Sequence, residues 1–179
     1  MKTFKILFAA VLFLAISTGV NVQAQPPLQD QATVEASARV FVPISITNTS
    51  PLQFGNIAQN TTASVLMDGG ISNAGLLGSE TSLGVFEISG DSRTETQISF
   101  SGMDNFSLNG PVGSDPLTVT AFWEYKTGEE DATPATNGTS YNLIDGEGTL
   151  TVGGDIVVGE ALEGSYTGSV MITVEYTAL

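Results

Sequence analysis

The chain has 179 residues with 19 acidic and five basic side chains, no histidine and no cysteine, and a formal net charge of −14. Because phosphate binding depends on Lys and Arg, this charge balance argues against nucleic acid and anionic membrane surfaces as partners. The missing His and Cys exclude Ser-His-Asp and Cys-His catalytic sets, disulfides and the usual zinc sites.

The first 24 residues have the three parts of a secretory signal peptide. Lys2 and Lys5 precede an apolar run, Ile6 to Ile16, and small residues end the segment at Ala24. The run is shorter than the roughly 20 residues of a membrane-spanning helix. We therefore expect an exported protein, found in the periplasm, at the cell surface or outside the cell, with no membrane insertion after cleavage.

Cleavage after Ala24 leaves 155 of the 179 residues and, without the two signal lysines, a net charge of −16. That length is typical of one domain. We predict a signal peptide over residues 1–24, a short N-terminal lead over residues 25–31, and a single β-sandwich domain over residues 32–179.

Along the first half of this domain, apolar residues recur at alternate positions. The alternation over residues 33–42 predicts a long first strand, which Pro43 interrupts with a bend, a bulge or an edge position. Residues 61–67 predict a weaker strand, and the glycine-rich residues 68–78 predict a loop.

Two further strand patterns, residues 83–89 and 94–101, are separated by the turn-like cluster Gly90 to Arg93, which predicts a hairpin. The strongest internal alternation is Leu117 to Tyr125. It places Trp123 on the inner face, where a large aromatic side chain is most often a core anchor.

An acidic, small-residue stretch, residues 126–140, predicts an exposed loop. Residues 149–152 and 155–158 are strand patterns flanking Gly153-Gly154, and two glycines suit a tight two-residue hairpin turn. The mature chain contains no convincing amphipathic helix. Many short strands with Gly, Pro and Asn between them predict an all-β fold, an antiparallel immunoglobulin-like β-sandwich.

The last strand pattern, Tyr166 to Tyr176, is rich in Val and Thr and has one apolar face. Such a strand must bury that face in a sandwich or barrel, and it can leave a pairing edge open. Val170, Ile172 and Val174 on its inner face would line any open groove. The alternative is that these three are ordinary core residues of a closed sandwich.

Few residues of the chain are candidates for catalysis or metal binding. The carboxylates available for acid-base catalysis or calcium binding are Glu129, Glu130, Asp131, Asp145 and Glu147. They lie in predicted loops without an apolar pocket pattern, and they do not match the twelve-residue calcium loop. Solvated loops are the favoured interpretation. We therefore predict no enzyme, no catalytic, cofactor-binding or metal-binding residue, and no cofactor.

Several motifs in order resemble a known family: Pro43-Ile44-Ser45-Ile46, Leu52-Gln53-Phe54-Gly55-Asn56-Ile57, Phe86-Glu87-Ile88-Ser89-Gly90, Leu150-Thr151-Val152-Gly153-Gly154, and Gly164 through Tyr176. The chain resembles a bacterial secreted family, the domain of unknown function DUF4402, which is in turn similar to spore-coat-U-type and other chaperone-usher pilin subunits. This resemblance implies an immunoglobulin-like sandwich, exported by a Gram-negative bacterium, that builds a surface fibre.

The resemblance also implies strand addition, in which a neighbour's N-terminal segment fills a groove left by a missing strand. Residues 25–31 lack alternating large apolar residues and look poor as such a donor. The leading hypothesis is thus a non-enzymatic structural module, a pilus- or fimbria-like subunit that associates with itself or with a secretion chaperone. The alternative is a monomeric extracellular binding module that presents acidic loops to calcium, glycan or a protein.

Overall fold

The computed structural model describes residues 31–73, 80–93 and 96–178. The chain divides into two units, residues 1–39 and residues 40–179. In the first unit, the described residues 31–39 contain no strand or helix, and every one of them is exposed. The predicted signal peptide and residues 25–30 of the predicted lead lie outside the described residues.

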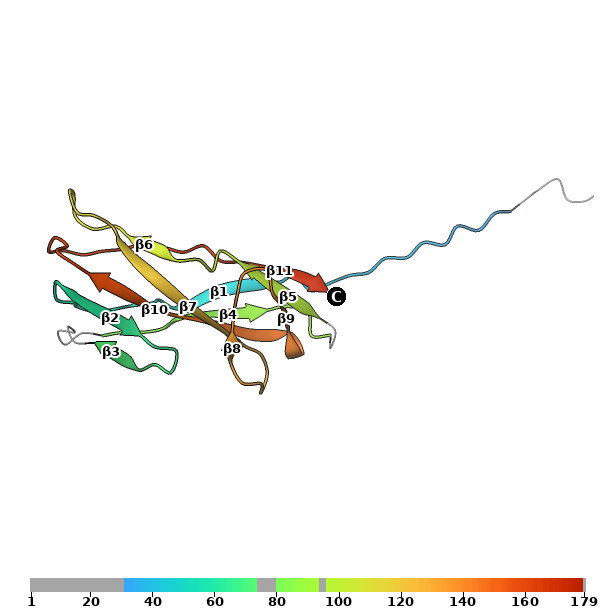
Figure 1. Cartoon of the computed structure of the whole chain (residues 1–179). Coiled ribbons are helices and arrows are strands. Elements are labelled where there is room, and N and C mark those ends of the chain that lie inside the picture. Colours follow the sequence, from blue (N-terminus) through green and yellow to red (C-terminus); the bar gives the residue numbers. More distant parts are fainter. Residues whose placement is uncertain (1–30, 74–79, 94–95, 179) are drawn as a thin grey trace, which may run out of the picture. The chain divides into compact units, whose positions relative to one another are not determined.

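The described residues of the second unit form β-strands and one short 3₁₀ helix, and the strands make two antiparallel sheets (Figure 1). The all-β sandwich predicted from the sequence is confirmed. The elements in chain order are β1 Ser45–Ser50, β2 Thr61–Val65, β3 Ile71–Asn73, β4 Gly84–Ser89, β5 Gln97–Ser101, β6 Phe106–Leu108, β7 Leu117–Lys126, β8 Thr133–Pro134, β9 Ser140–Asn142, η1 Ile144–Gly146, β10 Glu147–Val158 and β11 Thr173–Ala178.

The larger sheet is organised around the two longest strands, β7 and β10, which pair from Thr149↔Lys126 to Ile156↔Val119. Along its other edge, β10 pairs first with β4 and then with β2. Strands β1 and β3 extend this edge, while β6 and β8 pair with the outer side of β7. Two strands therefore run the length of the sheet and carry shorter partners at each end.

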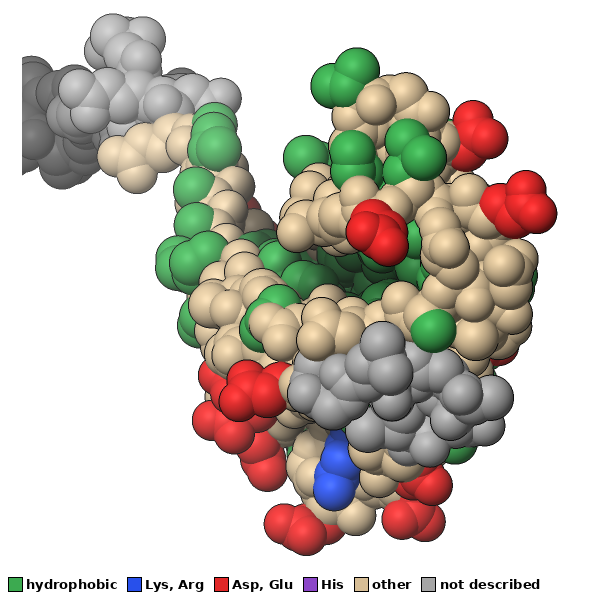
Figure 2. Space-filling view, turned by 90° about the vertical axis from the view of Figure 1, so that its left-hand side faces the viewer, with side chains coloured by type: hydrophobic (Ala, Val, Ile, Leu, Met, Phe, Trp, Pro, Cys, Tyr) green, Lys and Arg blue, Asp and Glu red, His purple; other side chains and the backbone are tan. Residues whose placement is uncertain are grey.

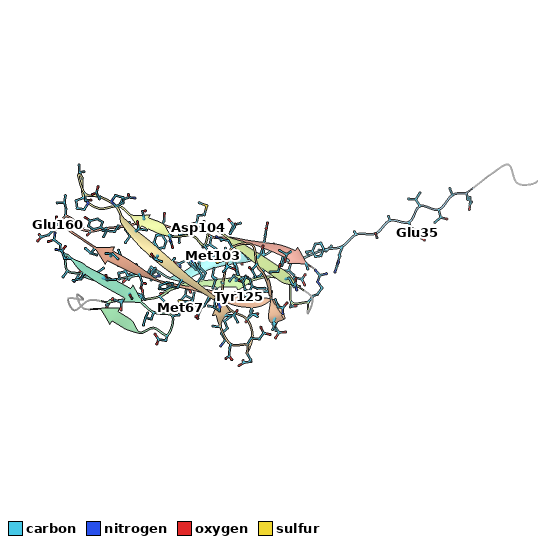
Figure 3. The ribbon with its side chains drawn as sticks, viewed as in Figure 1. Glu35, Met67, Met103, Asp104, Tyr125 and Glu160 are labelled. Atoms are coloured by element: carbon cyan, nitrogen blue, oxygen red, sulfur yellow. The ribbon has the colours of Figure 1, made fainter. Side chains whose placement is uncertain are left out.

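The smaller sheet has the order β11-β5-β9. Between the two sheets lies an aromatic cluster of Phe100, Tyr125 and Tyr141, with ring centroids 5.3 to 5.8 Å apart. Figure 3 labels Tyr125 near the crossing of β7 and the smaller sheet. Trp123 is 6% exposed, as predicted for an inner-face anchor, and packs against Phe86. We call this half of the sandwich, in which one sheet covers the other, the closed half.

Two strand predictions are wrong. Residues 33–42 belong to no strand: the first strand is β1, from Ser45. Residues 84–89 and 97–101 do form strands, but β4 lies in the larger sheet and β5 in the smaller one. The cluster Gly90 to Arg93 is thus a connection between sheets and not a hairpin turn, because alternation predicts a strand without naming its partner.

The predicted hairpin at Gly153-Gly154 is also wrong, since β10 continues through both residues. Neither glycine has a positive φ. A Cβ on Gly153 would lie 2.4 Å from the Val65 carbonyl oxygen, and one on Gly154 would lie 2.9 Å from that of Thr120. The glycines therefore allow close backbone approach where β10 changes partner from β4 to β2.

Other predictions hold in part. Strand β2 occupies residues 61–65 as expected, but the predicted glycine-rich loop contains β3. The predicted last strand, residues 166–176, has the expected alternation of half-buried and exposed side chains, yet ladder pairing begins only at Thr173. Within the described residues, no helix reaches the length and apolarity that a bilayer span requires.

Candidate functional site: an open groove in the sandwich

A groove of about 1060 Å³ opens in the half of the domain that the smaller sheet does not cover. Two irregular segments form its rims: residues 51–59, which continue β1, and residues 161–170, which lead toward β11. We call this half the open half. The volume is slightly above the roughly 300–1,000 Å³ typical of small-molecule pockets.

The floor of the groove is apolar. It consists of side chains from the larger sheet and the two rims, among them Leu52, Phe54, Phe86, Phe106, Leu108, Leu117, Val152, Ile156 and Val158. Figure 2, which views the domain from one end, shows a hollow with hydrophobic side chains inside it and acidic side chains around it. Of the described residues that line the groove, Glu163 alone is charged. The site therefore suits an uncharged, apolar occupant.

The rim at residues 161–170 offers a free backbone edge. Thr167 exchanges two backbone hydrogen bonds with Asn109, at 2.7 and 2.9 Å. Among the described residues, these are the only backbone-to-backbone hydrogen bonds made by residues 163–172. Because alternate residues of an extended segment direct their amides and carbonyls to opposite sides, the backbone groups of Tyr166 and Gly168, on either side of Thr167, are expected to point away from Asn109.

The opposite rim is tied to the larger sheet and, at its end, to the other rim. Gln53 and Ser82 exchange backbone hydrogen bonds of 2.9 and 3.0 Å. The Gln59 side-chain amide donates to the Ala161 carbonyl, and the Asn60 amide donates to the Gly159 carbonyl. Glu160, labelled in Figure 3, lies at this end of the domain, away from β11. The two rims are therefore joined at this end of the groove.

A polar cluster lies at the other end, where β11 ends and the chain enters the domain. The Tyr176 hydroxyl donates to the Val42 carbonyl at 2.9 Å and accepts from the Asp91 amide at 2.8 Å. Arg93 pairs with the Asp91 carboxylate through two bonds, of 2.6 and 2.8 Å, and its guanidinium lies 4.8 Å from the Phe41 ring centroid. We call this group the entry clamp, because it holds residues 41 and 42 against the domain.

The side-chain hydrogen bond from Arg93 is the main cause that lowers the pKa of Asp91 to about 2. The backbone amides of Arg93 and Val42 also donate to this carboxylate and act in the same direction, while burial opposes them. Asp91 therefore favours its ionised form near neutral pH, and its bonds to Arg93 there are charge-assisted.

The structure divides the three side chains expected to line a groove. Val170 lines the groove and also packs against the core of the closed half, whereas Ile172 and Val174 pack against that core and do not line the groove. Among the acidic candidates, Glu129, Glu130 and Asp131 are exposed in the turn between β7 and β8, and Asp145 and Glu147 are exposed around η1. Within the described residues, no group of three or more acidic, His or Cys side chains gathers as a metal site would require.

The acidic turns nevertheless adjoin a smaller hollow of about 190 Å³, lined by Tyr125, Thr127, Glu130, Asp131, Thr133, Ser140, Tyr141 and Asn142. Thr127 joins the two turns: its hydroxyl donates to the Glu147 carbonyl and accepts from the Ile144 amide. Burial raises the pKa of Tyr125 to about 12, and its hydroxyl donates to the Asn142 carbonyl. This hydroxyl therefore stays protonated and acts as a structural donor.

The family model described as "Domain of unknown function (DUF4402)" matches residues 44–176. The chain belongs to this family. No curated protein matches the chain. The match begins at the residue after Pro43 and ends at Tyr176, so it spans both rims of the groove, while residues 31–43 precede it.

Sequence reasoning missed most of this site. The rim at residues 51–59 has no regular alternation that would mark it, and the apolar floor residues carry the same pattern as any core strand. What the sequence does carry is an excess of strand-like patterns: residues 33–42 alternate like a core strand but have no place in either sheet.

Proposed function

We propose that this DUF4402 domain is a non-enzymatic, exported structural subunit whose open sandwich is completed by an extended strand from another polypeptide. The observation that carries the proposal is the groove: an apolar floor between two rims, one of which has backbone groups with no backbone partner among the described residues. A strand laid there would pair with these groups and bury the floor, which is how strand addition gives both affinity and specificity.

The backbone edge beside the groove favours an extended strand over a small molecule as the occupant. The backbone edge beside the groove offers amides and carbonyls to an extended strand, and the single charged lining residue, Glu163, offers little to a charged ligand. This is the arrangement expected of an immunoglobulin-like fold that lacks one strand, as in the pilus-like subunits that the sequence resembles. The predicted signal peptide would direct the export of such a subunit, which could then reach the bacterial surface.

The experiment is size-exclusion chromatography with light scattering on the exported full chain, isolated without heating, for the wild type and two groove variants. Leu162→Asp changes a groove-lining side chain that is 49% exposed, and Val170→Asp changes the rim beside the backbone edge. We expect multimers of the wild type that dissociate only on heating and that both variants lack, because a carboxylate in a covered apolar groove would be left unpaired.

The matched control is Val157→Asp, which adds the same charge at a side chain on β10 that is 66% exposed and does not line the groove. It should leave the multimers intact. Loss of multimers in the control as well, or multimers that persist in both groove variants, would contradict the proposal.

The smaller hollow favours a second candidate function, a binding module that presents acidic loops, because it brings two tyrosines and two acidic residues together beside those loops. Calcium titration of the full chain tests its metal version. A ligand that binds only the folded state must raise the melting temperature, so an unchanged melting temperature at millimolar calcium would rule that version out.

A further inference from the structure

The chain contains two Asn-Gly pairs, Asn109-Gly110 and Asn137-Gly138. Asparagine is chemically labile in proteins, and a following glycine has no side chain to shield its own amide nitrogen. We propose that Asn109, in the bridge that holds the groove rim, is a site of spontaneous deamidation in the folded protein, and that the reaction releases this rim. The site does not depend on what fills the groove, so it goes beyond the proposed function.

The reaction joins the Gly110 backbone nitrogen to the side-chain carbon Cγ of Asn109. The nitrogen loses its proton and attacks this carbon, the carbon–nitrogen bond of the side-chain amide breaks, and ammonia leaves with a proton. The product is a cyclic succinimide. Water then opens the ring at either carbonyl and gives aspartate or isoaspartate. The net change consumes one water and releases one ammonia, so water is the only co-reactant.

The reacting groups at Asn109 are free to meet. Asn109 is exposed, and among the described residues neither its side chain nor the Gly110 amide has a hydrogen-bond partner. The two bonds that Asn109 makes with Thr167 come from its own backbone amide and carbonyl. The attack therefore breaks no hydrogen bond of the attacking nitrogen or of the side-chain amide.

The corresponding groups at Asn137 are held by three hydrogen bonds. The side-chain oxygen of Asn137 accepts from the Met103 amide, and its side-chain nitrogen donates to the Asp104 carboxylate, each at 2.9 Å. The Gly138 amide donates to the Phe100 carbonyl at 2.9 Å. Because these bonds must break before attack, we expect Asn137 to react at least about tenfold more slowly than Asn109.

The attack also requires rotation of the main chain at Asn109, which the loop of residues 110–115 must follow. Val112 in this loop is fully exposed, and Gly113 has a positive φ with no atom within 4 Å of its Cβ position. The Tyr166 ring lies against Gly110 and must be displaced. Tyr166 belongs to the rim, whose few backbone bonds make local opening low in free-energy cost.

Isoaspartate at position 109 would break the bridge to the rim. In this product the main chain runs through the former side-chain carbon, which adds a methylene group between the amide and the carbonyl of the residue. Thr167 bonds both groups, at 2.7 and 2.9 Å, and such a closely spaced antiparallel pair requires ordinary backbone spacing. Among the described residues, residues 163–172 make no other backbone-to-backbone hydrogen bond. Loss of this pair therefore releases one wall of the groove.

Peptide mapping by mass spectrometry tests the site. The full chain is incubated in mildly alkaline buffer, which favours the deprotonated nitrogen, and is sampled both folded and unfolded in urea. In the folded chain, Asn109 should convert at least about tenfold faster than Asn137. In urea this difference should disappear, because the three bonds that protect Asn137 are lost.

Hydrogen exchange at the Thr167 amide tests the effect on the rim. The matched control is Asn109→Gln, whose longer side chain disfavours ring closure and whose backbone can keep the bridge. After incubation, isoaspartate-containing wild type should exchange the Thr167 amide at least about tenfold faster than fresh protein, since two backbone bonds are lost. Asn109→Gln should exchange this amide at an unchanged rate.

Two kinds of result would overturn the proposal. Conversion of Asn109 that is no faster than that of Asn137 in the folded chain would reject the site. A converted chain that keeps the Thr167 amide protected, or an incubated Asn109→Gln variant that loses this protection equally, would reject the effect on the rim. The groove variants Leu162→Asp and Val170→Asp test the proposed function separately, so the two failures are distinguishable.

Discussion

The closed and open halves of the sandwich share two strands, but only in the closed half does a second sheet cover these strands. Strands β7 and β10 run through both halves. In the closed half the smaller sheet covers them, and Phe100 and Leu150 are at most 1% exposed. In the open half their apolar faces form the floor of a groove between two irregular rims. The same strand can thus belong to a covered core at one end and to an uncovered apolar surface at the other.

The closed half provides most of the packing that stabilises the domain, and the open half provides the candidate binding surface. The closed half has three rings in mutual contact and a second sheet with full ladder pairing. The open half has a rim held by one pair of backbone bonds at Thr167. Regions with few buried contacts and unpaired backbone groups unfold locally at a low cost in free energy. Segments that bind ligands often belong to such regions.

The largest expected effect compares two phenylalanines. Phe100→Ala removes a ring that is 1% exposed in the closed half and should lower the free energy of unfolding by about 3–5 kcal/mol. Phe106→Ala acts on a half-buried ring beside the groove and should cost less than about 2 kcal/mol, because one side of that ring is already open. Urea denaturation of both variants measures the difference, and equal losses would refute the division into halves.

The next effect concerns the glycine at the junction of the halves. Gly153→Ala places a Cβ against the Val65 carbonyl oxygen, so β10 or β2 must shift, and we expect a loss of about 1–3 kcal/mol. Gly159→Ala is the control, because a Cβ there meets nothing within 4 Å. Its unfolding free energy should stay within about 0.5 kcal/mol of the wild type. A neutral Gly153→Ala would show that the strands can separate at the junction without cost.

A smaller effect compares two tyrosine hydroxyls. Tyr176→Phe removes both hydroxyl bonds of the entry clamp and should cost about 1–2 kcal/mol. Tyr166→Phe removes one exposed bond to the Leu162 carbonyl at the groove rim and should be nearly neutral. Limited proteolysis near residues 40–42 provides a second measurement: cleavage should become faster in Tyr176→Phe and stay unchanged in Tyr166→Phe.

The smallest effect is the pH dependence of the clamp. The pKa of Asp91 falls from an ordinary value of 3.8 to about 2 in the folded protein. Because the folded state favours the ionised carboxylate, the clamp contributes its full stabilisation above about pH 4 and loses it as the pH falls toward 2. The stability difference between the wild type and Asp91→Asn should shrink across this interval. A difference that stays constant from pH 5 to pH 2 would mean that the charge of Asp91 contributes nothing.

Much of the architecture follows from residue patterns. The alternation over residues 117–125 became β7 with Trp123 buried, and the fold class and the family followed from the motifs. Local patterns succeed here because a strand's two faces are fixed by the pleat and by burial, whatever its partner. Alternation does not identify the partner of a strand, because distant residues determine the pairing. The hairpins predicted at residues 90–93 and 153–154 are wrong for this reason.

What the sequence by itself determined is that this chain is an acidic all-β protein without His or Cys, with more strand-like segments than one sandwich uses. Only the tertiary structure decided which of these segments join a sheet and where the sandwich leaves an open groove. Residues 32–40 and Tyr166 to Val170 both alternate, but the first segment is exposed and belongs to no strand, while the second forms a groove rim. The physical reason is that alternation records the need to bury one face, and only the packing of the remaining strands shows whether that need is met within the chain.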